Sequence, residues 1–253
     1  MRGQRSYQED AAATCPGDAT FAWEDTALVP PHGQLLAVLA DGMGGHAGGA
    51  EASKTVCRAF LESCAAAGHE DTPGRLVTAL SAANEQISRR VTVNPELSGM
   101  GTTLIGAVFG DEGLEWVSVG DSPLYLIRRD EIALLNEDHS LAPALDRLAA
   151  EGTISEHAAK SDPRRHMLRS AITGEEIELV DVSKKPLALV AEDLVILASD
   201  GIHTIDEGEI LRVANGYLAD GPESVARALI RAVESQRDPY QDNTTVVVVQ
   251  PRG

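Results

Sequence analysis

Strand-like and helical patterns of apolar residues alternate along most of the chain. Residues 35–40 and 194–198 are unbroken apolar runs of strand length, a pattern typical of strands buried on both faces. Apolar residues at helical spacing predict two helices in the first half of the chain and two in the second. The first pair is expected to begin near Ala50 and at Pro73, and the second pair to cover 206–214 and 223–235.

The middle of the chain changes to short strands. Four apolar runs follow one another there and are joined by very short polar turns. Such turns permit antiparallel neighbours and exclude parallel crossovers, which need about a dozen residues or more. The pattern therefore predicts an antiparallel meander. Its runs are 102–109, 114–119, 124–127 and 131–135, and later strands are expected at 177–182 and 246–249.

Two stretches interrupt the regular pattern. Residues 14–33 contain several Pro and Gly residues and predict an irregular excursion. A short helix is expected over 144–150, and residues 152–175 carry few large apolar side chains, so we expect an exposed excursion there. The chain has no internal repeat, linker or low-complexity segment. We therefore predict one domain over residues 1–253.

The charge of the chain narrows the range of partners. Its 253 residues include 21 Lys and Arg and 39 Asp and Glu, a formal net charge of −18. Because like charges repel, nucleic acid and anionic membranes are not expected partners. The apolar runs are too short to span a membrane, and the N-terminus has no apolar segment typical of a signal peptide. Three cysteines without a CxxC pair favour the reducing cytoplasm over a disulfide scaffold or a zinc site.

Carboxylates stand at the ends of separate apolar strands. Asp41, Asp121 and Asp200 each follow a strand-like run, and Asp242 precedes the last one. A carboxylate at the mouth of a buried strand is costly unless a cation or hydrogen bonds compensate it. One such residue is explained equally well by a turn. Four of them, meeting at one rim of a sheet, would form an all-oxygen site suited to Mg²⁺ or Mn²⁺ rather than to zinc or copper.

Residues 42–47 also fit the GxGxxA fingerprint of dinucleotide-binding folds. The surroundings argue against that interpretation. Asp41 would repel a pyrophosphate, and Glu62, the acidic residue about 20 positions on, lies inside a predicted helix. The strands that follow form a meander instead of a βαβ unit, and the chain contains no GxxxxGK[ST] P-loop.

Six short motifs are distributed over nearly the whole chain. They are Arg5-Ser-Tyr-Gln-Glu9-Asp10, Asp41-Gly42-Met43-Gly44-Gly45-His46, Gly101-Thr102-Thr103, Gly120-Asp121-Ser122, Asp200-Gly201 and Asp242-Asn243-Thr244-Thr245. In this order they resemble the motifs of the metal-dependent serine/threonine protein phosphatases, the protein phosphatase 2C type in its compact bacterial form. Each motif is weak alone, and the specificity comes from their order and from the predicted strands between them.

The resemblance implies an α+β fold of two packed antiparallel β-sheets flanked by pairs of antiparallel helices, an αββα sandwich. It implies a metal-dependent phosphoprotein phosphatase, in which a bridging metal-bound water attacks the phosphate in line without a covalent intermediate. The implied substrates are phosphoserine and phosphothreonine proteins, with a cognate Ser/Thr kinase as a partner. A cytoplasmic monomer is expected.

The resemblance also implies a centre of two Mn²⁺ or Mg²⁺ ions, to which bacterial members add a third, weaker one. Asp41 would bridge the two ions, and the carbonyl of Gly42 would bind one of them. Asp200 and Asp242 would complete the set of ligands. Asp121 would hold the third ion together with Asp200.

Other residues match the groups that support such a centre. Arg5 matches the arginine that binds the substrate phosphate. Glu9 and Asp10 match residues that hold metal-bound waters. Thr103 and Asn243 match polar residues that stand behind the ligands.

The sequence departs from the family at the expected general acid. Some members have a histidine directly after the Asp-Gly pair, and this chain has Met43 there. His46, three residues on, or a metal-bound water would then protonate the leaving alkoxide.

Residues of about 142–173 match the flap of bacterial members, beside the active site. We hypothesise that its basic residues help to select phosphoprotein substrates, and a solvated loop without this role is the alternative. These residues are Arg164, Arg165, His166 and Arg169.

A rival function remains for the chain as a whole. A catalytically silent relative would bind phosphoproteins as a regulatory module without hydrolysing them. Such a protein would be expected to lack at least one metal-binding aspartate, and all the matching aspartates are present here.

Overall fold

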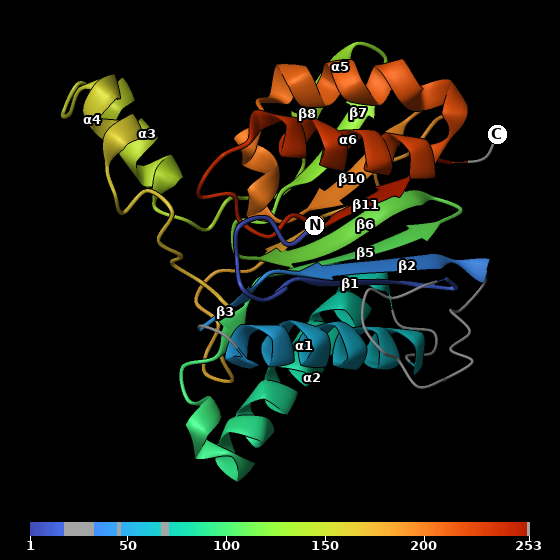
Figure 1. Cartoon of the computed structure of the whole chain (residues 1–253). Coiled ribbons are helices and arrows are strands. Elements are labelled where there is room, and N and C mark those ends of the chain that lie inside the picture. The colour runs from blue at the N-terminus through green and yellow to red at the C-terminus, as the bar shows by residue number, and fades with distance from the viewer. Residues whose placement is uncertain (18–32, 45–46, 67–70, 252–253) are drawn as a thin grey trace.

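Two antiparallel sheets packed face to face form the centre of the fold, as Figure 1 shows. The computed structural model describes residues 1–17, 33–44, 47–66 and 71–251. One sheet has the order β1 (Ala11–Cys15), β2 (Leu35–Ala40), β5 (Leu104–Gly110), β6 (Gly113–Val119) and β9 (Asp181–Val182). The other has the order β11 (Val246–Val249), β10 (Leu194–Ala198), β7 (Leu124–Arg128) and β8 (Glu131–Leu134). A short ladder pairs β3 (Gly42–Met43) with β4 (Gly101–Thr102).

A pair of helices covers the outer face of each sheet (Figure 1). The first pair, α1 (Ala47–Ala66) and α2 (Thr72–Val93), packs beside the five-stranded sheet. The second pair, α5 (Glu207–Tyr217) and α6 (Pro222–Gln236), packs beside the four-stranded sheet. Short 3₁₀ helices occupy Pro95–Leu97, Asp200–Thr204 and Leu218–Asp220. The predicted αββα sandwich is therefore confirmed.

The period of two along a strand explains these layers. In β2, Leu36 and Val38 face the helices, while Ala37 and Leu39 face the other sheet. All four are fully buried, as are the corresponding positions of β10. A strand between two apolar layers needs apolar residues on both faces, which accounts for the unbroken runs at 35–40 and 194–198.

Several boundaries differ from the prediction. The strand predicted at 177–182 is wrong for its first four residues, because only Asp181 and Val182 form β9. The run predicted at 102–109 is split at Thr103 between β4 and β5. The predicted meander is wrong between 114–119 and 124–127, because β6 and β7 do not pair and the short turn between them passes from one sheet to the other. Strand β1 lies in a stretch where the sequence indicated no strand, since a run of small alanines carries little hydrophobic signal. Most of the predicted excursion at 14–33 lies outside the described residues.

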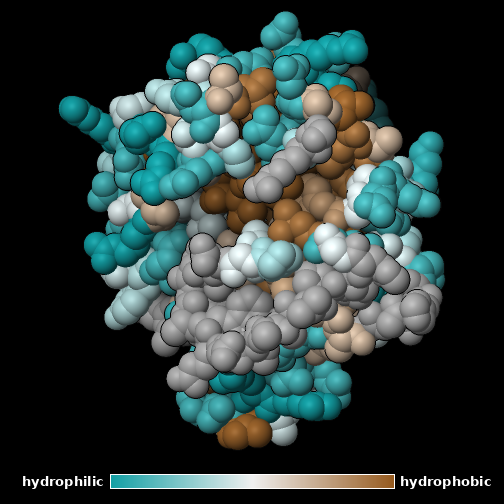
Figure 2. Space-filling view, turned by 90° about the vertical axis from the view of Figure 1, so that its right-hand side faces the viewer, coloured by the Kyte–Doolittle hydropathy of each residue, from teal (hydrophilic) through white to brown (hydrophobic). Residues whose placement is uncertain are grey.

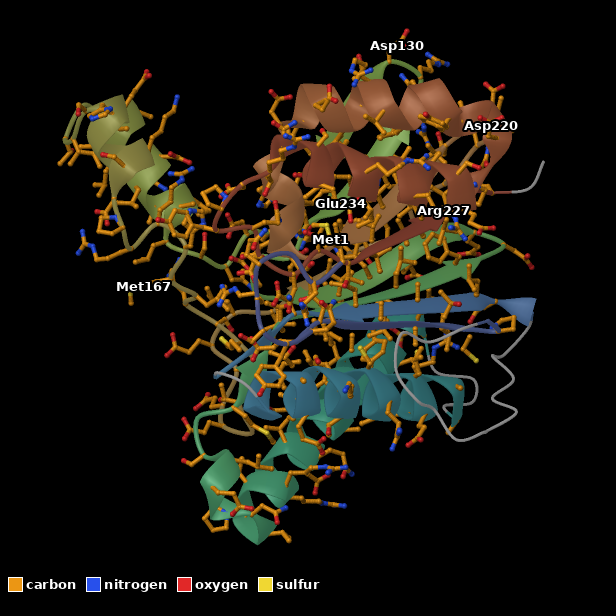
Figure 3. The ribbon with its side chains drawn as sticks, viewed as in Figure 1. Met1, Asp130, Met167, Asp220, Arg227 and Glu234 are labelled. Carbon is orange, nitrogen blue, oxygen red and sulfur yellow. The ribbon has the colours of Figure 1, made fainter. Side chains whose placement is uncertain are left out.

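Residues 142–173, which we call the flap, contain α3 (Ala142–Ala150) and α4 (Glu156–Ser161), which pack against each other. These two helices stand away from the layers (Figure 1), whereas the end of the flap rejoins the body, where Ile172 is buried and bridges to Thr102. Helix α4 was not predicted, because it has six residues and one buried side chain. The amide of Leu141 donates to the carbonyl of Met167 (3.0 Å), so the two ends of the flap are joined where it leaves the body. Figure 3 labels Met167 on the part of the flap that follows α4 and returns to the body.

The first residues of the chain lie against the start of the last strand and beside α6. The Met1 ammonium donates to the carbonyl of Thr244 (2.6 Å), and the amide of Thr244 donates back to the carbonyl of Met1 (2.9 Å). Met1 and Glu234 of α6 line the same small hollow, and they lie near each other in Figure 3. These contacts hold residues 1–10 beside the sheets, where two of the sequence motifs meet.

Hydrophobic residues reach the surface at one side of the molecule. Figure 2 shows them gathered in the middle of the face that forms the right-hand side of Figure 1, between more hydrophilic regions. Within the part of the chain that is described, no helix is long and apolar enough to cross a membrane.

Candidate metal centre

Antiparallel pairing brings six strand termini to one end of the sandwich. The end of β2 lies beside the start of β5, since Leu39 pairs with Ile105. The end of β6 lies there too, since Leu104 pairs with Val119. In the second sheet, the end of β10 meets the starts of β7 and β11. The four aspartates at these termini are therefore delivered to one place, as their positions along the strands predicted.

A single cavity of about 630 Å³ opens between these strand termini. Its lining includes nearly all the predicted site residues that the structure describes. They are Arg5, Glu9, Asp41, Gly42, Thr103, Asp121, Asp200, Asp242 and Asn243. The tenth, Asp10, is 2 % exposed and lies behind this lining.

The backbone of Asp41 is fixed on both sides by two threonines. Its amide donates to Thr103 Oγ1 (3.0 Å), and its carbonyl accepts from the Thr103 amide (2.9 Å) and from Thr102 Oγ1 (2.8 Å). Thr103 Oγ1 also shares a hydrogen bond of 2.7 Å with Ser122 Oγ. Beside Asp41, a Cβ at Gly42 would overlap the carbonyl oxygen of Gly49, so only glycine lets these backbones approach.

The carboxylates repel one another. Burial raises the pKa of Asp41 well above its ordinary value, and Asp10, Asp200, Asp121 and Asp242 raise it further. Burial, with the charges of Asp200 and Asp138, raises the pKa of Asp121 to about 7.

Burial and neighbouring charges also act on Asp10 and Asp200. Burial raises the pKa of Asp10 to about 6, and hydrogen bonds from Ser199 and Thr245 oppose the rise. Burial and then the charge of Asp242 raise the pKa of Asp200. A group of buried, mutually repelling oxygen donors fits a divalent cation, which would reverse these shifts.

Arg5 forms an ion pair with one member of this group. Its guanidinium donates to Asp242 Oδ2 at the edge of the cavity, and the Arg5 side chain stays 54 % exposed. The hydrogen bond to Asp242 raises the pKa of Arg5, with smaller contributions from the charges of Glu9 and Asp200. An exposed guanidinium at the mouth of the cavity can form a bidentate pair with an incoming phosphate.

The carboxylates line one cavity but are not arranged as a closed set of metal ligands. No three His, Cys, Asp or Glu side chains of the described residues come close enough together to enclose a metal ion as they stand. Asp242 is directed to Arg5 and, through Oδ1, accepts from the amide of Asn243 (2.7 Å). Closing the donor set around a cation therefore requires rotation of these side chains and release of Arg5.

Asn243 ties the first motif to the last one. Its Oδ1 accepts from the amide of Glu9 (2.7 Å), and its Nδ2 donates to the carbonyls of Arg2 and Tyr7 (2.8 and 3.0 Å). These bonds give the polar segment before β1 a defined course past the cavity. They explain why an Asp-Asn pair, and not an isolated Asp, stands before β11.

Asp10 is held from the second sheet. Ser199 Oγ donates to Asp10 Oδ2 (2.8 Å), and the amide of Thr245 donates to the same hydroxyl (2.9 Å). Ser199 is not among the predicted site residues, although a polar residue directly before Asp200 at the end of a buried strand is a usable signal.

The position of the general acid predicted from the sequence can be described only in part. His46 lies outside the described residues. Met43, at the position where some phosphatases have a histidine, lines the cavity.

The four basic residues of the flap divide into two groups. Arg164 pairs with Asp162 and Arg165 with Asp146, both at 2.8 Å, so these two hold the flap's own structure. His166 lines the cavity. The fourth, Arg169, lines it as well.

Sequence reasoning also missed His139. It is 3 % exposed, and burial lowers its pKa. Its Nδ1 accepts from the amide of Gly120 (3.2 Å), directly before Asp121. In the sequence, His139 stands in the polar stretch before the helix expected over 144–150, and no periodic pattern there indicates a role for it.

Comparisons with known proteins agree with this geometry. Residues 14–219 match the family model described as protein phosphatase 2C. The serine/threonine protein phosphatase PstP of Mycobacterium tuberculosis is 36 % identical over 222 residues, which are 85 % of this chain and 40 % of PstP. The serine/threonine phosphatase stp of Listeria innocua is 31 % identical over 222 residues, 86 % of this chain and 84 % of that protein.

A solved structure gives the same result in three dimensions. The catalytic domain of PstP in complex with two manganese ions superimposes with a TM-score of 0.72 at 30 % identity, over 99 % of this chain and 94 % of that one. The chain thus spans less than half of full-length PstP but nearly all of its catalytic domain. The order of the six motifs, the strand termini that gather them and these similarities together show that the chain belongs to the protein phosphatase 2C family.

Proposed function

We propose that the protein is a serine/threonine phosphoprotein phosphatase that depends on Mn²⁺ or Mg²⁺. The observation that carries the proposal is the meeting of four strand-terminal aspartates and Arg5 at one cavity. Phosphate monoesters hydrolyse very slowly unaided, and enzymes accelerate this reaction by up to about 10²¹-fold. A cavity that combines oxygen donors for cations with an arginine for the phosphate meets both needs of this reaction.

Each aspartate has a role in this proposal. Asp41 and the carbonyl of Gly42, with Asp200 and Asp242, would hold two divalent cations, and Asp121 with Asp200 a third. When bound, these cations would lower the pKa of a water and offset the charge of the phosphoryl oxygens. The raised pKa values of Asp41, Asp121 and Asp200 support this assignment, because buried carboxylates that repel one another gain most from a shared cation.

The surrounding residues keep the donors in position. Thr103 and its neighbour Thr102 hold the backbone of Asp41 from both sides. Asn243 fixes the backbone of Glu9, and Ser199 orients the carboxylate of Asp10. Glu9 and Asp10 would thereby accept hydrogen bonds from ordered waters beside the cations.

Arg5 changes partner in the course of binding. It contacts Asp242 in the structure, and a phosphate would offer the guanidinium two oxygens in place of that carboxylate. The exchange would free Asp242 for a cation at the moment when Arg5 takes the phosphate. Substrate and cation would therefore each favour the binding of the other.

The flap would contribute to substrate choice through two of its basic residues. His166 and Arg169 line the cavity, whereas Arg164 and Arg165 are engaged within the flap. We also propose that the layers and the flap form one catalytic domain, that the protein acts as a monomer in the cytoplasm, and that a Ser/Thr kinase supplies its substrates. His46 or a bound water would protonate the leaving alkoxide.

The test is release of phosphate from a phosphothreonine peptide with added Mn²⁺, with chelator as one control and the Asp41→Asn variant as the other. We expect turnover that requires Mn²⁺ and is lost in the variant. A wild-type protein that binds the peptide and Mn²⁺ without turnover would instead be the silent regulatory relative.

A further inference from the structure

We propose that His139 is a positioning residue that fixes the turn carrying Asp121 and ties this turn to the base of the flap. The inference rests on the proposed function, because Asp121 is assigned there to a cation. It concerns a residue between β8 and α3 that lines no part of the cavity.

His139 and Gly120 exchange two hydrogen bonds. The amide of Gly120 donates to His139 Nδ1 (3.2 Å), and the amide of His139 donates to the carbonyl of Gly120 (3.1 Å). Gly120 is buried at the end of β6 and directly precedes Asp121. The imidazole therefore satisfies a buried N–H that no ladder partner takes, and so sets the course of the backbone into Asp121.

The turn leaves little freedom for another arrangement. Gly120 has a φ of +102°, and a Cβ there would lie 2.5 Å from Thr103 Cγ2. Thr103 itself binds the backbone of Asp41. The Gly120 turn is thus packed between the residue that supports Asp41 and the imidazole that supports Asp121.

The backbone carbonyl of His139 contacts the flap. This carbonyl accepts from the amide of Arg169 (2.8 Å), and Ser140 forms a β-bridge with Leu168. Backbone hydrogen bonds therefore join the two ends of the flap at His139, the residue whose ring supports the Asp121 turn. A displacement of the flap base would move this ring and, with it, the turn.

The chemistry of the contact distinguishes substitutes for histidine. A ring nitrogen that accepts an N–H must be unprotonated, so in the neutral imidazole the proton is on Nε2. The side-chain oxygen of Asn reaches about the position of Nδ1, whereas that of Gln reaches about the position of Nε2. His139→Asn should preserve the bond to Gly120, and His139→Gln should lose it.

The test uses both variants in the full chain, with His157→Ala as a control, since His157 is an exposed flap histidine. Calorimetric titration with Mn²⁺ reports the tight and the weaker binding events. Hydrogen exchange reports the amides of residues 118–122 and 167–169.

We expect His139→Gln to weaken the weaker Mn²⁺ event about tenfold or more, a typical effect of removing a group that supports a metal ligand. The tight events should stay unchanged, and both segments should exchange faster. His139→Asn and His157→Ala should match the wild type within about threefold. If His139→Gln does not fold, His139→Ala takes its place in the same two measurements.

The inference is overturned if His139→Gln leaves both measurements unchanged, or if His139→Asn behaves like His139→Gln. A wild-type protein without a weaker Mn²⁺ event would refute the assignment of a third cation and not the role of His139. The exchange rates then decide alone. Faster hydrogen exchange of both segments in His139→Gln, but not in His139→Asn, supports the link between the Asp121 turn and the flap base. Equal exchange rates in the two variants refute it.

Discussion

Replacing Asp121 by Asn should stabilise the cation-free protein at high pH and leave its stability unchanged at low pH. The carboxyl pKa rises from its ordinary 3.8 to about 7 in the folded protein, mainly through burial and then through the charges of Asp200 and Asp138. Between these two pH values the folded state binds more protons than the unfolded state. Stability therefore falls as the pH rises through that window, and an amide at this position removes the loss.

The size of the effect follows from the same shift. A rise from 3.8 to about 7, at about 1.36 kcal/mol for each pH unit, corresponds to on the order of 4 kcal/mol. Partial solvation of Asp121 and the cost of burying the new amide reduce this figure, and we expect a gain of about 2–3 kcal/mol at pH 8. For a chain of this length, about 1 kcal/mol shifts the melting temperature by about 2–4 °C, so the variant should melt on the order of 8 °C higher.

The assay is calorimetric melting of both proteins in chelator at pH 4, 6 and 8, followed by melting with excess Mn²⁺ at pH 7.5. The two melting temperatures should coincide at pH 4 and separate at pH 8, and Mn²⁺ should raise the wild type more than the variant. Asp146→Asn is the control. Arg165 lowers the pKa of Asp146, so removing this carboxylate should lower the melting temperature slightly at pH 8, a change of opposite sign. If Asp121→Asn brings no gain at pH 8 without cations, Asp121 does not belong to a repelling carboxylate group.

Three further predictions concern the site and the core. Asp242→Ala should lower Mn²⁺-dependent phosphopeptide turnover by about 100-fold or more with unchanged circular dichroism, and normal activity would show that Asp242 is no ligand. Arg5→Lys should raise the KM for a phosphopeptide about tenfold with a smaller change in kcat, because Lys lacks the bidentate fork; an unchanged KM would remove Arg5 from phosphate binding. Gly106→Ala should lower the free energy of unfolding in urea by about 1–3 kcal/mol, because its methyl group would overlap the Phe60 ring. Gly216→Ala, at an open position in α5, should not destabilise, and equal urea midpoints for these two variants would contradict the packing argument.

The fold could be predicted where one local pattern had one structural explanation. The apolar runs that became β2 and β10 required burial on both faces, and the short turns β5–β6 and β7–β8 required antiparallel neighbours. The turn between β6 and β7 was predicted wrongly as part of the same meander, because it joins the two sheets and a short connection does not by itself decide which strands pair. The prediction was wrong at 177–180, where side-chain contacts decide the backbone. Ser170 Oγ donates to the carbonyl of Leu179 (2.9 Å) and accepts a hydrogen bond from the amide of Leu179 (3.0 Å). These side-chain bonds take the place of a strand ladder at this position.

The sequence by itself determined which residues are buried and which carboxylates stand at strand ends, because periodicity and composition report the surroundings of each residue along its own element. Only the tertiary structure decided which distant segments adjoin: Arg5 beside Asp242, Ser199 against Asp10, and His139 beneath the Asp121 turn. Each of these contacts joins residues whose separation along the chain carries no periodic signal. They are fixed by the order of strands in the two sheets, which depends on the packing of the whole molecule.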